Sequence, residues 1–207
     1  MKLQISFDMT NLEQAITIAQ DIAPFADIIE IGTLLVYTHG IQAVEAFRKA
    51  FPKQTLLVDS KIVDRGKEVV TLFAKAGADW ITVMAGTNKN VIHTACSTAH
   101  DLKIKVMLDL LDAESIGQSA LEAENLGADA LLFHESHDDA TVTFLDKWEM
   151  IQGNTKLPIF VSHHIKRETI EKILSVKPHG VVIGRSITAA SNPAQEAAFF
   201  REVCDNA

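Results

Sequence analysis

The sequence lacks the features of several protein classes, and each absence narrows what the chain can be. No stretch approaches the roughly 18 consecutive apolar residues of a membrane-spanning helix. The N-terminus MKLQISFDMT shows no signal-peptide pattern. Lys and Arg number 19 against 27 Asp and Glu, without the basic run typical of nucleic-acid binding. We therefore expect a chain that starts at Met1, stays in the cytoplasm and binds neither membrane nor nucleic acid.

Cysteine is scarce as well. Cys96 and Cys204 lie far apart, without the spacing of a metal site, so we expect both to stay reduced. Otherwise the composition is ordinary for a globular protein: 207 residues, 47% of them hydrophobic and 22% charged. No linker divides the chain, and we predict one domain over residues 1–207. With a net charge of -8, an anionic substrate would need a local cation.

Eight apolar runs have the length and composition of buried strands. They cover residues 3–7, 28–32, 55–61, 80–86, 104–110, 130–136, 157–163 and 180–186. Segments with helical periodicity lie between them, among them 11–25, 40–51, 66–77, 115–127 and 167–177. This alternation indicates right-handed crossovers and a parallel sheet. Eight units predict a closed (β/α)8 TIM barrel; the alternative, a flavodoxin-like open sheet, would leave strands unused.

The joint between helix and strand recurs along the chain. FADIIE, GADWIT and GADALL each place Ala-Asp directly before a strand, and PHGVVI occupies the same place before the last one. We expect His179, within that last joint, to be a surface residue. The repeat supports a chain built from similar units.

Polar residues gather where the predicted strands end, which is the face of such a barrel that holds the active site. They are Asp8, Glu30, Asp59, Lys61, Asp109, His134, His137, Ser162, His163, His164, Gly184 and Arg185. Any one acid could be a helix cap or a loop ion pair, but acids on four strand ends favour a functional site. Asp59 and Lys61 occupy alternate strand positions, so we expect both side chains to project into the barrel mouth.

The segment DSKIVD, residues 59–64, resembles the Asp-x-Lys-x-x-Asp motif of the orotidine 5'-monophosphate decarboxylase superfamily. The start MKLQISFD, the segment DIIEIGT and the spacing to GRSI are similar to one branch of it, which holds 3-hexulose-6-phosphate synthase and 3-keto-L-gulonate-6-phosphate decarboxylase. The resemblance covers essentially the whole chain. It implies a homodimer with active sites at the subunit interface, a bound Mg2+ and a phosphorylated sugar substrate.

The resemblance also implies roles for individual residues. Glu30 and Asp59 would bind Mg2+, a cation that prefers carboxylate oxygens, and Asp8 would lie near the substrate hydroxyls. Lys61 would stabilise the charge of an enediolate, and Asp64 would reach the site of the neighbouring subunit.

His134 would move a proton, a role that suits an imidazole because its ordinary pKa lies near 6.5. Asp109 at the end of the fifth predicted strand completes the expected catalytic set. The substrate-binding set comprises Asp8, Asp59, His137, Ser162, His163, His164, Gly184 and Arg185.

Two activities of this branch share the enediolate. The synthase adds the enediolate of ribulose 5-phosphate to formaldehyde, whereas the decarboxylase forms it by loss of CO2 and yields L-xylulose 5-phosphate. Asp109 matches the aspartate of the synthase, where the decarboxylase typically has glutamate. FHESHDD and GRSI are decarboxylase-like, but His137 replaces an arginine that helps deliver the proton. We favour the synthase, because a decarboxylase without both groups lacks two that are specific to its chemistry. A non-catalytic or altered sugar-phosphate-binding barrel is a third hypothesis.

The sequence departs from the branch after the seventh predicted strand. Relatives typically carry Gly-Gly there, and their backbone N–H groups approach the substrate phosphate. This chain has His163 and His164, and we expect these side chains to narrow the phosphate site and to disfavour a positive φ. The backbone of Gly184 and the side chain of Arg185 would still hold a phosphate.

Overall fold

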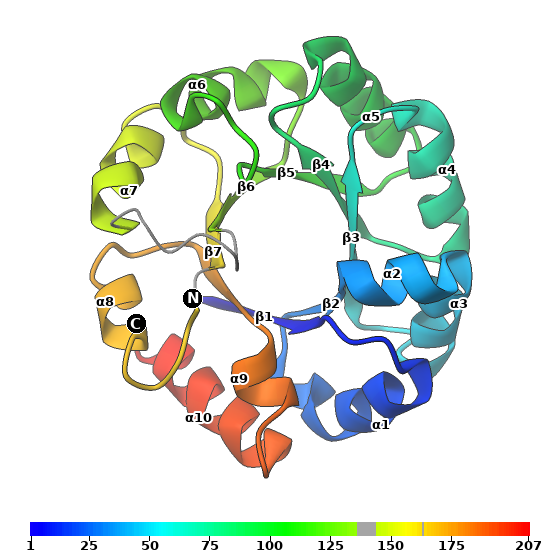
Figure 1. Ribbon diagram of the computed structural model, residues 1–207, viewed down its shortest axis with the longest axis vertical. Helices are drawn as coiled ribbons and strands as arrows, with labels where there is room; N and C mark the ends of the chain where they lie inside the picture. The colour runs from blue at the N-terminus through cyan, green and yellow to red at the C-terminus, as the bar shows by residue number, and fades with distance from the viewer. Residues whose placement is uncertain (136–143, 163) are drawn as a thin grey trace.

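The computed structural model describes residues 1–135, 144–162 and 164–207, and its eight parallel strands close into a barrel (Figure 1). The strands are β1 (Lys2–Phe7), β2 (Ile28–Ile31), β3 (Thr55–Ile62), β4 (Trp80–Met84), β5 (Lys105–Asp109), β6 (Ala130–His134), β7 (Ile159–Ser162) and β8 (Gly180–Ile183). Each strand pairs with the next in sequence, and β8 closes the ring against β1. The predicted (β/α)8 TIM barrel is confirmed, and the open-sheet alternative is wrong.

Helices surround the barrel (Figure 1). They are α1 (Leu12–Ile22), η1 (Ala23–Phe25), α2 (Thr33–His39), α3 (Ile41–Ala50), α4 (Gly66–Ala76), α5 (Lys89–Asp101), α6 (Ile116–Leu126), α7 (Phe144–Gln152), α8 (Ile170–Leu174), α9 (Arg185–Thr188) and α10 (Pro193–Asp205). No helix within the described ranges is long and apolar enough to cross a bilayer.

Two short helices, α2 and α9, were not predicted from the sequence. Both follow directly on a strand and are too short to show a helical period. The last predicted strand, 180–186, therefore stops at Ile183, because Gly184 already precedes the first turn of α9.

Alternating strand positions separate two apolar regions. Outward residues such as Leu3, Ile5 and Phe7 of β1 belong to the large core beneath the helices. Inward residues form a smaller cluster of Ile28, Leu57, Met107, Ala130, Leu132, Phe160 and Val182. Two positions further along the strands, the inward residues are polar, among them Glu30, Asp59, Asp109, His134 and Ser162. The barrel is thus filled with apolar side chains below and is polar at the mouth.

The recurring helix–strand joint has a structural role. Asp27, Asp79 and Asp129 each accept a hydrogen bond from a backbone N–H of the preceding strand; the donors are Leu3, Leu56 and Val106, at 2.9, 2.8 and 2.8 Å. At the fourth joint, Nδ1 of His179 accepts the corresponding bond from the N–H of Ile159, at 3.1 Å. His179 is exposed, as predicted, and it is also the counterpart of the three aspartates.

This equivalence predicts which substitutions His179 tolerates. His179→Leu leaves the N–H of Ile159 without its acceptor, so urea titration should show a loss of about 1–3 kcal/mol in the free energy of unfolding. His179→Asp supplies the acceptor found at the other joints and should lose much less. His93→Leu, on the exposed face of α5, is the control and should be neutral. Equal losses for the two His179 variants would show that the acceptor does not matter.

Candidate active site

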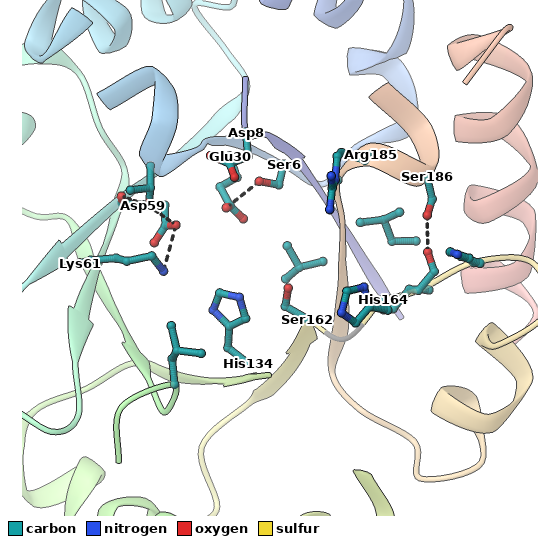
Figure 2. Close-up of a pocket in the computed structure, with 17 residues that line it drawn as sticks. Ser6, Asp8, Glu30, Asp59, Lys61, His134, Ser162, His164, Arg185 and Ser186 are labelled. Atoms are coloured by element: carbon teal, nitrogen blue, oxygen red, sulfur yellow. Dashed lines mark hydrogen bonds and ion pairs between the residues drawn. The ribbon is translucent and has the colours of Figure 1, made fainter. Parts of the chain in front are cut away.

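A pocket of about 600 Å3 opens at the carboxyl ends of the strands (Figure 2). Its volume lies within the range of about 300–1,000 Å3 usual for small-molecule sites. The lining comprises Ser6, Asp8, Glu30, Thr33, Asp59, Lys61, Leu111, His134, Ser162, His164, Ile165, Lys166 and residues 182–186. Figure 2 shows carboxylates, Lys61 and His134 toward one side, and His164 with Arg185 toward the other. The two sides therefore differ in charge.

The ammonium of Lys61 links two strand-end carboxylates. Its Nζ lies 3.1 Å from Oδ2 of Asp59 and 3.1 Å from Oδ2 of Asp109. The same oxygen of Asp109 lies 3.1 Å from Nδ1 of His134. The side chain of Asp109 is fully buried and does not line the pocket, so it acts on the pocket through Lys61 and His134.

This arrangement favours the charged forms of Lys61, Asp109 and His134 relative to burial alone. Burial opposes the charge of Lys61, but Asp59 and Asp109 raise the pKa of Lys61 above its ordinary value. Burial also opposes the charge of Asp109, yet the hydrogen bond with His134 and the nearby Lys61 lower the pKa of Asp109. Burial works against the charge of His134 too, but the contact with Asp109 outweighs it and raises the pKa of His134. Nδ1 of His134 faces a carboxylate, which only accepts, so we assign the Nδ1–H tautomer.

Asp59 and Lys61 come together for a reason that differs from the prediction. Their strand is not regular: the register of β3 against β4 shifts between Val58 and Ile62. Lys61 itself has a φ of 43°, in the left-handed region. An irregularity in β3, and not simple alternation along a strand, therefore brings the ammonium to the carboxylate.

Glu30 is a buried carboxylate held by its neighbours. Nε2 of Gln4 donates to Oε2 at 2.5 Å, and Oγ of Ser6 donates to Oε1 at 2.7 Å. Burial and the negative charge of Asp59 raise the pKa of Glu30 to about 7. In the described part of the chain, no Lys, Arg or His nitrogen lies within 4.0 Å of this carboxylate.

The carboxylates of Glu30 and Asp59 are suitable ligands for a cation. Glu30 and Asp59 offer hard oxygens at one side of the pocket, and a positive charge between them would offset the repulsion that raises the pKa of Glu30. No group of three or more His, Cys, Asp or Glu side chains in the described residues is arranged to hold a metal ion. Two carboxylates suit Mg2+, which usually keeps several waters and binds substrate oxygens.

The other side of the pocket carries basic and small residues. His164 has a φ of 34°, so the loop adopts the positive φ that a histidine was expected to disfavour. Gly184, Arg185 and Lys166 also line the pocket. Among the residues described, no carboxylate oxygen lies within 4.0 Å of the guanidinium of Arg185. This guanidinium can therefore bind an anion.

The remaining predicted site residues have other positions. Asp8 lies at the rim, where Oδ1 accepts a 2.9 Å hydrogen bond from the N–H of Leu34 in the first turn of α2. Asp64 is exposed and does not line the pocket of its own chain; its Oδ1 accepts from the N–H of Arg65. His137 and His163 lie outside the described residues.

Sequence reasoning missed the polar groups that hold the acids. Oγ1 of Thr33 donates to Oδ2 of Asp59 at 2.6 Å, and Oγ1 of Thr82 donates to Oδ1 at 2.9 Å. Gln4 and Ser6 hold Glu30 in the same way. Gln4 and Ser6 interrupt the apolar strand β1, and Thr82 interrupts β4. Because buried polar residues normally need a partner, these positions point to polar neighbours. That signal was present in the sequence.

Known proteins match the chain along nearly all of its length. The family described as "Orotidine 5'-phosphate decarboxylase / HUMPS family" matches residues 1–200. A 3-hexulose-6-phosphate synthase of Bacillus subtilis (strain 168) is 29% identical over 206 residues, covering 98% of each chain. Among solved structures, 3-hexulose-6-phosphate synthase from Salmonella typhimurium has a TM-score of 0.94 and 29% identity, covering 100% of this chain and 99% of that one. KGPDC from Streptococcus mutans, solved with a bound ligand, has a TM-score of 0.90 and 27% identity, covering 99% and 97%.

The contact between His134 and Asp109 predicts a measurable change in titration. Because Asp109 raises the pKa of His134 against the effect of burial, Asp109→Asn should move the pKa of His134 down. Imidazole 15N NMR spectra recorded against pH will detect the shift. Asp129→Asn removes a carboxylate from His100 on the outside of the barrel and should leave His134 unchanged. An unaltered His134 titration in Asp109→Asn would contradict the assignment.

Proposed function

The chain belongs to the orotidine 5'-phosphate decarboxylase / HUMPS family, and we propose that within it the protein is a carbon–carbon lyase of the 3-hexulose-6-phosphate synthase type. The proposed reaction joins ribulose 5-phosphate and formaldehyde to give hex-3-ulose 6-phosphate, and it is reversible. The buried group of Asp59, Lys61, Asp109 and His134 beside the pocket carries this proposal. The named synthases among the relatives support it.

The chain's own residues suit each step of the condensation. A base removes a proton from C1 of ribulose 5-phosphate, and C1 of the resulting 1,2-enediolate attacks the carbon of formaldehyde. The oxygen of formaldehyde then takes up a proton, so no net proton is gained or lost. Because Nδ1 of His134 is held by Asp109, we assign both proton transfers to Nε2. The ammonium of Lys61 stabilises negative charge that develops on the enediolate oxygens.

We propose that Mg2+ is the cofactor and that Glu30 and Asp59 hold it. The bound cation would supply positive charge beside the substrate oxygens. Two features of the chain support this proposal: both ligands are buried carboxylates, and the charge of Asp59 already raises the pKa of Glu30.

Substrate orientation follows from the charges along the pocket. A phosphate dianion would be repelled by Asp8, Glu30 and Asp59, and attracted by Arg185. Placing the phosphate beside Arg185 directs the other end of the sugar toward Lys61 and His134. The sugar-phosphate enzymes named among the relatives, one of them solved with a bound ligand, support a sugar-phosphate substrate.

The second candidate is decarboxylation of 3-keto-L-gulonate 6-phosphate. The likeness to KGPDC favours it, whereas Asp109 in place of the glutamate expected for a decarboxylase favours the synthase. A barrel that binds a sugar phosphate without catalysis is the third candidate, and the buried Lys61 network argues against it, since such a network is costly to keep.

We also propose that the protein forms a homodimer in which Asp64 completes the partner's site. Asp64 does not line its own pocket, and it follows Val63, which is 58% exposed. Tyr37 on α2 is 74% exposed, and Leu34 in the same helix is also exposed. Large exposed apolar side chains beside an active-site mouth are typical of an interface.

The activity assay distinguishes the three candidates. The protein with ribulose 5-phosphate, formaldehyde and Mg2+ should consume formaldehyde, and excess chelator should abolish the reaction. Asp59→Asn should lower kcat/KM by at least about 100-fold, because it removes a ligand charge. Asp101→Asn, at the exposed end of α5, is the matched control and should be fully active.

Other results would change the proposal in defined ways. Release of CO2 from 3-keto-L-gulonate 6-phosphate, without formaldehyde consumption, would identify a decarboxylase. Binding of ribulose 5-phosphate in calorimetry without turnover of either substrate would identify a binding protein. Full activity in excess chelator would remove Mg2+ from the proposal.

The dimer predicts complementation between two inactive variants. Lys61→Ala and Asp64→Asn should each be inactive, but a hybrid dimer has one site with an intact Lys61 and an intact partner Asp64. After subunit exchange in an equal mixture, about a quarter of the wild-type activity should return. Lys61→Ala mixed with Asp109→Asn should stay inactive, because both residues act in their own chain. No recovery in the first mixture would place Asp64 outside the partner's site.

A further inference from the structure

The irregularity in β3 places three residues opposite a single residue of β4. The register shifts between Val58 and Ile62, and residues 59–61 lie opposite Thr82 alone. A bulge of this kind disrupts the hydrogen bonds of the ladder and redirects side chains, and bulges are frequent beside active sites. Thr82 is therefore the β4 residue that has to satisfy the polar groups of the bulge.

The hydroxyl of Thr82 contacts both charged residues of the bulge. Oγ1 donates to Oδ1 of Asp59 at 2.9 Å and accepts from the backbone N–H of Lys61 at 2.9 Å. A hydroxyl has one proton and two lone pairs, so it makes both bonds at once. Ser60 completes the bulge by donating from Oγ to the carbonyl of Thr82, at 2.9 Å.

The contact with Lys61 supports a strained backbone. A lysine with a φ of 43° is in a conformation that costs of order 1–3 kcal/mol and persists only when its surroundings hold it. Thr82 is 1% exposed, so no bulk water replaces its hydroxyl if the residue changes. Thr33 also donates to Asp59, but it does not hold the backbone of Lys61. Within the described residues, only Thr82 donates to the carboxylate of Asp59 and also accepts from the backbone of Lys61.

We propose that Thr82 is a positioning residue for the reaction. Its hydroxyl fixes the carboxylate of Asp59 and the backbone of Lys61 relative to each other, so that the cation site and the ammonium face the same substrate atoms. The effect on turnover rests on the proposed reaction, and the effect on cation binding rests on the proposed Mg2+ site at Glu30 and Asp59.

Two substitutions at Thr82 separate the hydroxyl from the rest of the side chain. Thr82→Val keeps the shape and removes the hydroxyl, whereas Thr82→Ser keeps the hydroxyl and removes the methyl group. For formaldehyde condensation at saturating Mg2+, kcat of Thr82→Val should fall about 10- to 100-fold, with KM for ribulose 5-phosphate changed less than about threefold. Thr82→Ser should stay within about threefold of the wild type in kcat.

A second readout does not depend on activity. Mn2+ prefers the same carboxylate oxygens as Mg2+, and its free form gives an electron paramagnetic resonance signal that is lost on binding. The Kd for Mn2+ should rise about tenfold or more in Thr82→Val and little in Thr82→Ser. Thr71 lies in α4, outside the pocket lining, and its hydroxyl donates to the carbonyl of Lys67. Thr71→Val is therefore the matched control and should match the wild type in all measurements.

The outcomes distinguish failure of this inference from failure of the proposed function. Wild-type kcat and Mn2+ affinity in Thr82→Val, or equal losses in Thr82→Ser and Thr82→Val, would overturn the positioning role. A wild type that binds Mn2+ but turns over neither sugar phosphate would refute the proposed reaction but not the proposed cation site, and the Mn2+ affinities would still test Thr82. Thermal unfolding shows that each variant is folded at the assay temperature; Thr82→Ala replaces Thr82→Val if the latter is not.

Discussion

The ammonium of Lys61 between the carboxylates of Asp59 and Asp109 is the interaction on which the barrel mouth depends. Removing an ion from water costs several kcal/mol, and only close pairing and further hydrogen bonds offset that cost. Both carboxylates have such support. Asp59 accepts from the hydroxyls of Thr33 and Thr82. Asp109 accepts from the N–H of Leu111 at 3.0 Å and contacts His134. Loss of one member leaves another charge buried without compensation, so the network acts as a unit.

The same mouth also holds charges of one sign close together, and this has a cost in stability. Glu30 has a pKa raised from an ordinary 4.5 to about 7, so the folded chain binds more protons than the unfolded chain between these values. The contribution of Glu30 to the free energy of unfolding therefore falls as pH rises through that window. A divalent cation between Glu30 and Asp59 would reverse the loss, because it binds the folded state. Under the proposed function, the protein without its cofactor is therefore less stable at the pH values at which Glu30 carries the charge that would bind the cation.

The sequence predicts the barrel well because the relevant physics is local and repeated. Buried parallel strands are nearly continuous apolar runs, and eight of them alternate with helices, so the order of strand pairing follows from the order along the chain. Strand-end acids could also be assigned to one face. The bulge in β3 could not, since it depends on how Thr82 pairs across strands, and neither could the short helix α2. Asp64 shows a further limit: in the proposed dimer, its surroundings would depend on a second chain.

Charge separation along the pocket explains how the chain tolerates a bulky residue in the loop after β7. A site that relied only on close backbone approach would need glycine, whereas His164 lines this pocket with a φ of 34°. Arg185 provides positive charge on the same side as His164, and Asp59 provides negative charge toward the other side (Figure 2). Under the proposed function, a reversed sugar phosphate would bring its dianion toward the carboxylates, where the interaction is repulsive and poorly screened. The proposed orientation of the substrate thus relies on long-range electrostatics, which depend less on the exact shape of the loop than backbone hydrogen bonds do.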